Sequence, residues 1–583
     1  MDEIEPLTIE RIDDVPILLA QLERMQVSKL LDRHFPTHGN WQGLSLGTVS
    51  VVWLSHILSE GDHWLNHVEP WASQRLNCLQ ACLGQEMRSL DLSDDRLAAV
   101  LDYLSDDEQW QTFERDLSQH LIRVYDLHPR RVRVDSSTVS GYVHPSPDGL
   151  FQFGHSKDHR PDLPQVKIKL SALDPLGLPL GVTIVSGQRA DDGLYVPAIQ
   201  HAQRTLEQVG LLYVGDCKMA ALATRAYVQQ SGDYYLCPLS GVQVSEASLQ
   251  QLVAPVQANT QAVTTIERQS EEDGSPEAIA VGYEYTRQVT LMQGESAVQW
   301  DERVLVIRSL KLAQRHQAAL QERLTKAQAE LVLLNQSEHQ RGKKVLRQVS
   351  EVREVVEAIV HRYRVDGLLE VQYQERVVSE RPVRRYRDRA ADTRVEREVS
   401  VSVQVNAGAV AQAEACLGWQ VYVTNQPTEQ LSLEQAVLAY REEYLIERGF
   451  GRLKGRPLSV SPLQLTSEPR VKGLLRLLSL GLRVLCLLEY QVRGQLAEQQ
   501  QALAGLYAGN PKRATRRPTS EALLKAFKGL HLTALSQQAQ TVYHVTPLSA
   551  LQERIIALLG FPSTLYSTLA LHSAELTFKM SEP

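Results

Sequence analysis

Cysteine is scarce in this chain, and its few positions form no recognisable ligand or disulfide pattern. The 583 residues include six cysteines. Cys78 and Cys82 lie one helical turn apart, but no second pair of ligands accompanies them, which argues against a zinc site. We therefore expect reduced, mostly buried thiols in a cytosolic protein. The other cysteines are Cys217, Cys237, Cys416 and Cys486.

A long uninterrupted apolar run and a charged-then-apolar leader are also missing. The chain opens instead with three acidic residues among its first five, which is unlike a secretory leader. Its most apolar stretch, 474–492, is broken by Arg476, Arg483 and Glu489. This pattern predicts a packed core helix rather than a membrane span. A chain of this length should form several domains that each bury a core, without the need for disulfide bonds or structural metal ions.

A basic excess, usual in nucleic-acid-binding proteins, is absent from the chain as a whole, whose formal net charge is −8. The charge is divided unevenly, however. Residues 441–528 hold sixteen basic and seven acidic side chains, whereas residues 1–120 hold eight basic and twenty-one acidic ones. This division predicts a basic surface that meets nucleic acid and an acidic helical part that serves dimerisation or packing. Taken individually, several arginines of the basic segment 441–528 could lie on ordinary solvated faces.

The segment 440–454 (Tyr-Arg-Glu-Glu-Tyr-Leu-Ile-Glu-Arg-Gly-Phe-Gly-Arg-Leu-Lys) is the most informative part of the sequence. As one helix of about 3.6 residues per turn, it would place Tyr440, Glu443, Glu447 and Lys454 on one face. A carboxylate beside an aromatic ring and a lysine suits a site that holds a metal ion and a phosphate backbone together. The alternative is an amphipathic helix with solvated charges.

Two aspartates further upstream each end a strand-like run. Asp135 follows alternating β-branched and polar residues at 131–134, and Asp216 follows the apolar run 211–215. In open α/β sheets, functional groups collect beyond the carboxyl ends of strands. Either aspartate alone could be a helix N-cap or a turn residue. Together with Glu447, they predict a cluster of three carboxylates.

The order of the neighbouring elements predicts a mixed α/β sheet. Three strands in a meander are followed by alternating helices and strands. The expected strands cover 131–135, 166–170, 180–185, 211–216 and 234–238, and the expected helices cover 195–209 and 219–230.

These features resemble a DDE transposase of bacterial insertion sequences, in the insertion-sequence-four-like group. The third acid of that group lies in a Tyr-x2-Arg-x3-Glu-x6-Lys signature. Tyr440, Glu447 and Lys454 match its spacing, whereas Glu443 stands where the signature has arginine. The segments 154–165 and 187–192 are similar to the family's segments between its first two acids, and the likeness covers about 130–240 and 418–490.

The resemblance implies an α/β fold with an RNase-H-like mixed sheet and flanking helices. A β-rich plus helical insertion would interrupt this fold, and an α-helical domain would precede it. The expected parts are a helical N-terminal domain at 1–125, the first catalytic part at 126–240, the insertion at 241–417, the second catalytic part with the glutamate helix at 418–495, and a helical C-terminal region at 496–583.

The resemblance also implies the chemistry. The catalytic residues and metal ligands would be Asp135, Asp216 and Glu447. Asp135 would bridge two Mg²⁺ ions, and Asp216 and Glu447 would each complete the coordination of one ion. Mn²⁺ could substitute for Mg²⁺. Two such ions about 3.5–4 Å apart serve in-line phosphoryl transfer, and hard cations prefer oxygen ligands. Water would first free a 3′-hydroxyl at the element's end, and that hydroxyl would then attack target DNA.

The implied partners are the transposon's terminal inverted repeats and target DNA, bound by a homodimer in the bacterial cytoplasm at the nucleoid and away from membranes. Contacts to the DNA backbone would set register rather than read sequence. Arg441 or Arg448 could supply the cation missing at position 443. The expected DNA-binding residues are Tyr440, Arg441, Arg448, Arg452, Lys454 and Arg456.

Three functions remain open at this stage. The first is a transposase that cleaves element ends and joins them to a target. The second is an RNase-H-like nuclease that cuts without joining. The third is a DNA-binding protein whose catalysis has lapsed, which the intact Asp135, Asp216 and Glu447 disfavour. Inverted repeats beside the gene would separate the first from the second.

Several other residues have competing interpretations. Asp191 and Asp192 rival Asp216 as the second acid, but their position after a glycine turn favours the start of a helix. His155 and His159 could ligate a metal, although loop contacts near DNA are expected from their Gly/Pro-bounded segment.

Two further features lie outside this region. Trp300 could stack a displaced base, but a sheet-core tryptophan is the preferred interpretation. The basic loop 511–517 could hold the DNA backbone or be a solvated linker.

Overall fold

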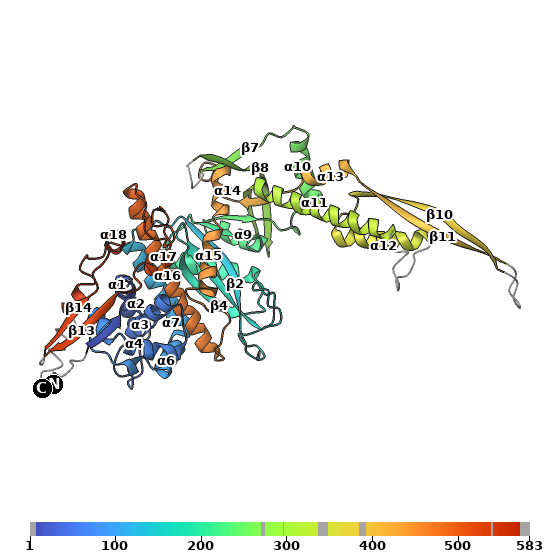
Figure 1. The fold of residues 1–583 in the computed structure, drawn as a ribbon. Helices are drawn as coiled ribbons and strands as arrows, with labels where there is room; N and C mark the ends of the chain where they lie inside the picture. Colours follow the sequence, from blue (N-terminus) through green and yellow to red (C-terminus); the bar gives the residue numbers. More distant parts are fainter. Residues whose placement is uncertain are drawn as a thin grey trace. The chain divides into compact units, whose positions relative to one another are not determined.

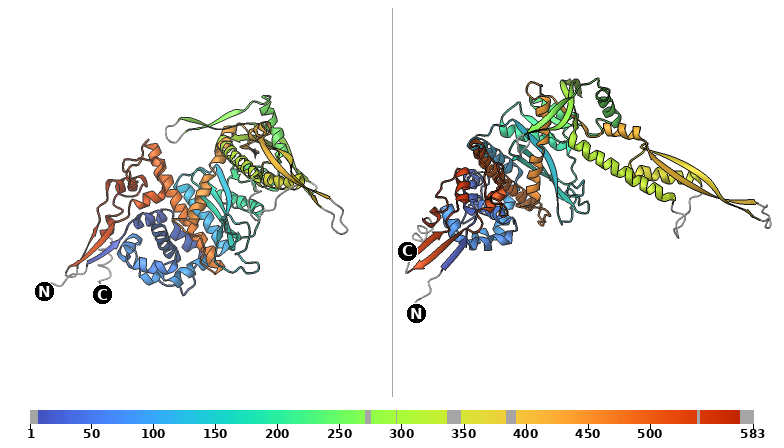
Figure 2. Two further views of the ribbon diagram at one scale, coloured as in Figure 1. Left: turned by 45° about the vertical axis from the view of Figure 1, so that its right-hand side comes forward. Right: turned by 45° about the horizontal axis from the view of Figure 1, so that its top comes forward.

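The computed structural model describes residues 7–269, 275–294, 296–335, 348–383, 392–537 and 540–571. The chain divides into two compact units, which are treated separately below (Figures 1 and 2). The first unit comprises Met1–Cys237, Thr290–Val298 and Ala439–Pro583, and the second comprises Pro238–Val289 and Gln299–Leu438.

The first unit contributes five neighbouring strands of a mixed sheet, in the order β4-β3-β2-β5-β6. The meander β2-β3-β4 is antiparallel, whereas β5 and β6 continue the sheet in parallel with β2. This strand order is that of an RNase-H-like sheet, and it confirms the mixed α/β fold expected from the sequence. The strands are β2 (Arg131–Ser140), β3 (Gln165–Leu173), β4 (Leu178–Ser186), β5 (Leu212–Gly215) and β6 (Tyr234–Pro238).

Burial explains why these segments form a central sheet. Every residue of β3 and of β5 is buried, and β2 is exposed on neither face. Strands covered on both faces are typical of sheets flanked by helices. Two of the flanking helices, α8 (Tyr195–Leu206) and α9 (Leu222–Gln230), lie within the ranges expected for helices.

The acidic N-terminal residues form a set of helices in the same unit. The Ser45 side chain caps α3 by accepting a hydrogen bond from the Thr48 amide. Helix α6 begins directly after Ser93. Serine is a favoured residue at both of these N-cap positions. The helices are α1 (Val15–Arg24), α2 (Val27–His34), α3 (Leu46–Glu60), α4 (Leu65–Ser73), α5 (Leu76–Leu83), α6 (Asp94–Leu104) and α7 (Asp107–Val124).

The apolar stretch 474–492 lies in α16 (Glu468–Glu498), a largely buried helix, as predicted. Its charged residues are buried with partners. Arg483 lies 2.6 Å from Glu114 of α7, and both side chains are almost completely excluded from solvent. Among the described helices, none combines the length and apolar character needed to cross a bilayer.

The terminal regions, which were expected to be helical, contain three strands in addition to their helices. Residues near both ends form a three-stranded antiparallel sheet, β1-β13-β14, with Ile9 opposite Thr533 (Figure 1). Each strand is short, and β1 and β13 are more than 500 positions apart. Because local sequence patterns do not reveal pairing over such a distance, the neighbouring helical segments determined the prediction. The strands are β1 (Leu7–Arg11), β13 (His531–Gln537) and β14 (Gln540–Val545), and the C-terminal helices are α17 (Ser520–Lys525) and α18 (Ala550–Leu558).

The second unit combines strands and helices, as expected for the insertion. Its strands follow the order β12-β9-β8-β7, and a separate hairpin pairs β10 with β11. Residues 384–391, between β10 and β11, lie outside the described residues. The strands are β7 (Thr264–Gln269), β8 (Pro276–Gln293), β9 (Ser296–Ser309), β10 (Leu369–Val383), β11 (Asp392–Val405) and β12 (Trp419–Thr424).

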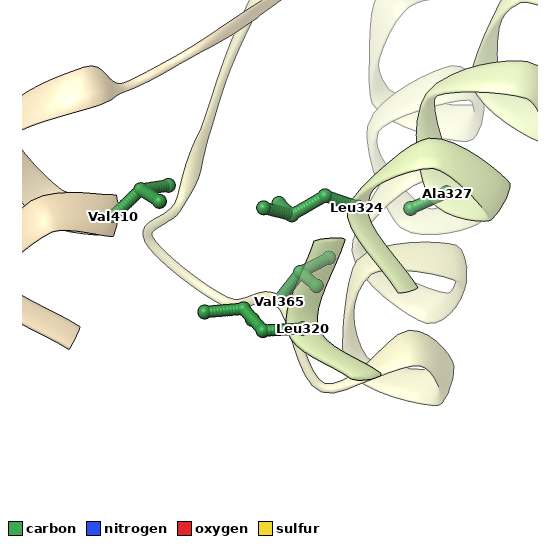
Figure 3. Packing of buried hydrophobic residues seen from close by; sticks show 5 residues of the cluster. All are labelled: Leu320, Leu324, Ala327, Val365 and Val410. Carbon is green, nitrogen blue, oxygen red and sulfur yellow. The ribbon is translucent and has the colours of Figure 1, made fainter. Parts of the chain in front are cut away.

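Apolar side chains from distant segments form the helical core of this unit. Leu320 and Leu324 of α11 pack with Val365 and Val410 (Figure 3). Trp300 is 5% exposed in β9, as expected for a sheet-core tryptophan. The helices are α10 (Glu246–Gln257), α11 (Leu310–Leu333), α12 (Val349–Tyr363), α13 (Ala407–Ala415) and α14 (Leu433–Arg441), whose last residues belong to the first unit.

Candidate active site

The two aspartates predicted at strand ends lie side by side. Strands β2 and β5 are parallel, and their last register pair is Val134 with Gly215. Asp216 directly follows β5, whereas Asp135 lies within β2, which continues to Ser140 and therefore does not end at Asp135 as expected. The two residues are the next along the chain after that register pair, so they lie beside each other where β5 ends. Burial raises the pKa of Asp135, and the neighbouring Asp216 charge acts in the same direction.

The glutamate segment is not the single helix expected from the sequence. Helix α14 ends at Arg441, and α15 (Tyr444–Lys454) begins after a turn at positions 442 and 443. In the turn, the amides of Glu443 and Leu445 donate to carbonyls three residues earlier. These tighter bonds interrupt the helix between Arg441 and Tyr444, whereas the Glu447 amide still donates to the Glu443 carbonyl, so Glu443 and Glu447 remain one helical turn apart.

Arginines from β2 hold this turn in place. Arg131 lies 2.8 Å from the Glu442 carboxylate, and Arg133 donates to the Ala439 carbonyl at 2.6 Å. Arg133 is itself buried and forms two hydrogen bonds to Asp174. The strand that carries Asp135 therefore also fixes the backbone that carries Glu443.

A small cavity of about 10 Å³ lies between the aspartates and the turn, and Asp135, Asp216, Tyr440 and Glu443 contribute to its wall. Burial raises the pKa of Glu443 to about 7, and the charges of Asp135 and Glu447 act in the same direction. A hydrogen bond with Tyr440 partly opposes this shift.

Glu447 lies one turn further along α15, and its side chain is exposed. It does not contribute to the wall of the cavity, although its charge acts on Glu443. Lys454 forms an ion pair with Asp158, which also accepts a hydrogen bond from the Ser140 amide. The structure therefore brings Asp135, Asp216, Tyr440 and Glu443 together, with Glu447 adjacent.

Two lysines balance the negative charge of the site. Lys157 lies 3.6 Å from Asp135 and is partly exposed. Lys169 is buried, and its ammonium lies 3.2 Å from the centre of the Tyr195 ring. Burial lowers the pKa of Lys169 to about 7, although Asp135 and Asp216 oppose the shift.

Tyr195 connects Lys169 to the acidic pair, because its hydroxyl donates to Asp216 at 2.6 Å. Sequence analysis did not identify this contact or the role of Lys169. The visible signal was the strand Val-Lys-Ile-Lys-Leu at 166–170, where two lysines alternate with apolar residues in an interior strand. A buried lysine requires a compensating charge or ring nearby.

The rival acids have other partners. Asp191 accepts a hydrogen bond from Ser136 at 2.9 Å and lies 2.8 Å from Lys167. In the loop that contains His155 and His159, Asp162 pairs with Arg160 at 2.7 Å. Within the described ranges, no group of three or more His, Cys, Asp or Glu side chains is placed to hold a metal ion as the side chains stand.

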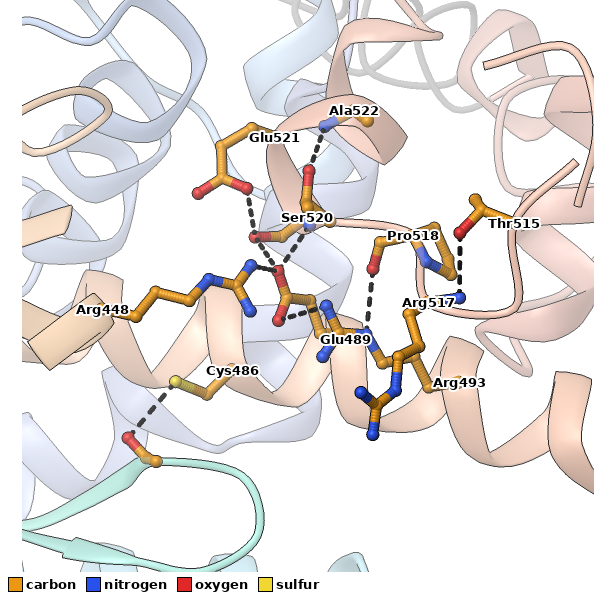
Figure 4. Close-up of polar contacts among 12 residues, drawn as sticks. Arg448, Cys486, Glu489, Arg493, Thr515, Arg517, Pro518, Ser520, Glu521 and Ala522 are labelled. Carbon is orange, nitrogen blue, oxygen red and sulfur yellow. Dashed lines mark hydrogen bonds and ion pairs between the residues drawn. The ribbon is translucent and has the colours of Figure 1, made fainter. Parts of the chain in front are cut away.

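Arg452 was expected to contact DNA, and the structure corrects this expectation. Its side chain is 6% exposed and pairs with Glu489 of α16 and Glu521 of α17. Glu489 also pairs with Arg448 and Arg493 (Figure 4). This arginine cluster joins α15 to α16, and Arg448 and Arg493 are partly exposed whereas Arg452 is buried.

The remaining basic candidates are more accessible. Arg456 is exposed just beyond α15, and Arg441 is half-buried. In the basic loop, Arg513 lies over the ring of Tyr507, 4.5 Å from its centre, and its neighbours Lys512 and Arg516 are exposed.

The donor set fits a hard divalent cation. Carboxylate oxygens of Asp135, Asp216 and Glu443 border one cavity, and Glu447 lies a turn away. Oxygen donors of this kind are the ligands that Mg²⁺ and Mn²⁺ prefer. Because Lys157 lies against Asp135, rotation of side chains would have to accompany cation binding.

Strand order and paired acids define an RNase-H-like protein with a carboxylate site. Comparison with known families agrees: residues 128–483 match the family described as "Transposase DDE domain". This match covers more than half of the chain, which therefore belongs to the DDE transposase family.

One similar solved structure is a cryo-EM structure of the piggyBac transposase synaptic complex with hairpin DNA. Sequence identity is 8% and the TM-score is 0.24, with 50% of this chain and 58% of that chain covered. The likeness thus spans less than two thirds of the piggyBac chain. No curated protein matches this chain.

Proposed function

We propose that this chain is a metal-dependent transposase that cleaves the ends of its element and joins them to target DNA, with cut-and-paste transposition as the outcome. The observation that carries the proposal is the placement of Asp135 and Asp216 beside each other on neighbouring parallel strands, where β5 ends, with Glu443 in the wall of the same cavity. The family match supplies the reaction class.

In this proposal, Asp135, Asp216 and Glu447 hold two divalent cations, with Mg²⁺ expected and Mn²⁺ able to substitute. Bound there, the cations would supply the charge that polarises a phosphodiester and lowers the pKa of an attacking hydroxyl. The chain itself orients these acids: Tyr195 holds Asp216 by a hydrogen bond, and the arginine cluster around Glu489 fixes α15.

The DNA would approach the exposed side of α15 and the segment after it. Arg456, Arg441 and Arg448 would contact phosphates, together with Tyr440 and Lys454 once the latter exchanges Asp158 for DNA. Such contacts set the register of the duplex rather than reading its bases. A homodimer would bridge two terminal inverted repeats, and the bacterial nucleoid would be the place of action.

A strand-transfer assay tests this function. Linear DNA that ends in a free 3′-hydroxyl at the tip of the gene's flanking repeat is incubated with purified protein, Mg²⁺ and a circular target. A transposase should produce target molecules covalently joined to the labelled 3′ end. Asp216→Asn and Glu447→Gln should bind the same DNA but yield no joined product.

The other outcomes separate the alternatives. Cuts without any joined product would point to an RNase-H-like nuclease. Binding without cutting or joining by the unmodified protein would indicate a DNA-binding protein whose catalysis has lapsed. Full activity of Glu447→Gln would exclude Glu447 as the third acid.

A further inference from the structure

Glu443 occupies the position at which this chain departs from the transposase signature. Its carboxylate faces the same small cavity as Asp135 and Asp216, whereas Glu447, which matches the signature, is exposed. The turn precedes both residues, and the Glu447 amide donates to the Glu443 carbonyl, so Glu447 lies one helical turn beyond the part of the cavity wall that Glu443 forms.

We propose that Glu443 is a metal-ligating residue of this site, a fourth carboxylate that binds a divalent cation together with Asp135 and Asp216. This inference rests on the proposed function and deepens it. Glu447 then completes the coordination from the exposed side, and the site holds four acids instead of three.

The placement of Glu443 is built into the fold. Arg131 holds the adjacent Glu442, and Arg133 holds the carbonyl of Ala439, so the turn is anchored to the strand that carries Asp135. A surface glutamate would need no such anchoring. Because the anchored turn directs a carboxylate toward two others, a cation between them would offset their mutual repulsion.

The size of the cavity agrees with this role. About 10 Å³ is room for roughly one water molecule or one small cation. Position 443 thus places a carboxylate in the cavity wall where the signature has arginine, so the phosphate-binding role of the signature residue has to be met from elsewhere. Arg448, which is partly exposed and pairs with Glu489, would meet it by sharing that pair with a phosphate.

Mn²⁺ binding to the full-length protein tests the inference without relying on activity. Free Mn²⁺ is followed by electron paramagnetic resonance in titrations of the unmodified protein, Glu443→Gln, Glu447→Gln and Asp216→Asn. Loss of one carboxylate ligand should weaken Mn²⁺ binding by about tenfold or more. Glu443→Asp, which keeps a carboxylate, should recover part of the affinity.

Glu86→Gln serves as the matched control, because Glu86 is exposed in the N-terminal helical region, and it should bind Mn²⁺ normally. Near-ultraviolet circular dichroism verifies that each variant is folded. Unchanged Mn²⁺ affinity in Glu443→Gln, together with loss in Asp216→Asn, would overturn the role of Glu443 and leave the proposed function standing. Unchanged affinity in Asp216→Asn would overturn the metal site itself.

Discussion

At Glu443, burial and neighbouring negative charge act in the same direction, and both raise its pKa to about 7. In an unfolded chain the pKa would be near the ordinary value of 4.5. The folded protein therefore binds more protons than the unfolded chain between these two values, and its stability falls as the pH rises through that window.

This difference predicts the stability of Glu443→Gln in metal-free protein. Glutamine carries no charge, so at pH 8 the free energy of unfolding of the variant should exceed that of the unmodified protein by about 2 kcal/mol after allowance for partial exposure. The variant should therefore unfold at a higher urea concentration. The difference should shrink as the pH falls and vanish well below pH 4.5, where Glu443 is protonated in both states. Equal urea midpoints at pH 8 would contradict the buried, acid-facing position of Glu443.

The hydroxyl of Tyr195 is expected to orient Asp216 for catalysis. Tyr195→Phe removes the 2.6 Å hydrogen bond and should lower the cleavage rate by about tenfold, because a hydrogen bond to a charged group contributes about 1.5–3 kcal/mol. DNA affinity should stay the same, which gel-shift titration would verify.

Tyr213→Phe is the matched control for that measurement. The Tyr213 hydroxyl is buried in the neighbouring strand β5 and has no hydrogen-bond partner within the described part of the chain. Its removal should leave cleavage unchanged. Equal cleavage rates in both variants would show that Tyr195 does not orient Asp216.

At the scale of elements, the position of α15 depends on one buried acid of α16. Glu489 forms ion pairs with Arg448, Arg452 and Arg493. It also accepts a hydrogen bond from the Ser520 amide. Removing one partner from a buried ion pair leaves the other charge uncompensated, which is strongly destabilising.

Glu489→Gln should therefore lower the free energy of unfolding by about 3 kcal/mol and should also reduce cleavage, because α15 carries Glu447. Urea denaturation followed by tryptophan fluorescence measures the first effect. Glu498→Gln, at the exposed end of the same helix, should change neither. If Glu498→Gln lost as much stability as Glu489→Gln, the arginine cluster around Glu489 would have no special role in stability.

Local signals were sufficient for the elements that carry the aspartates. Alternating and apolar runs located β2 and β5, and the acids that follow these runs located Asp135 and Asp216, although β2 continues beyond Asp135 to Ser140. The break between α14 and α15 was not predictable, because it depends on Arg131 and Arg133, some 300 positions away. Helix periodicity also did not show that Glu447 lies outside the cavity wall or that Arg452 is buried, because contacts to other elements decide both.

At the scale of the whole chain, a net charge of −8 coexists with a basic segment at 441–528. Within that segment the structure separates arginines that stabilise the fold from those that remain accessible. Arg452 and Arg483 are buried in ion pairs, whereas Arg456 is exposed. Only the second kind can displace counterions from DNA.

This separation predicts opposite behaviour for two neighbouring arginines. Arg456→Gln should weaken binding of end DNA and reduce the salt dependence of the affinity by about one unit of slope, without altering stability. Arg452→Gln should lower the urea midpoint because it disrupts the Glu489 cluster. Fluorescence anisotropy at several salt concentrations measures the binding.

Arg33→Gln, an exposed arginine in the acidic N-terminal part, is the control for both measurements and should alter neither. If Arg33→Gln and Arg456→Gln reduced the salt dependence equally, the DNA surface would not be confined to the region around α15.

The most direct test of the account uses a plasmid that carries the gene with its native flanks, incubated with purified protein and Mg²⁺. New 3′-hydroxyl ends are mapped for the unmodified protein and for Asp216→Asn. The account predicts ends at the tips of flanking repeats for the unmodified protein and none for the variant. Identical ends from both proteins would contradict it, because Asp216 would then not belong to the catalytic site.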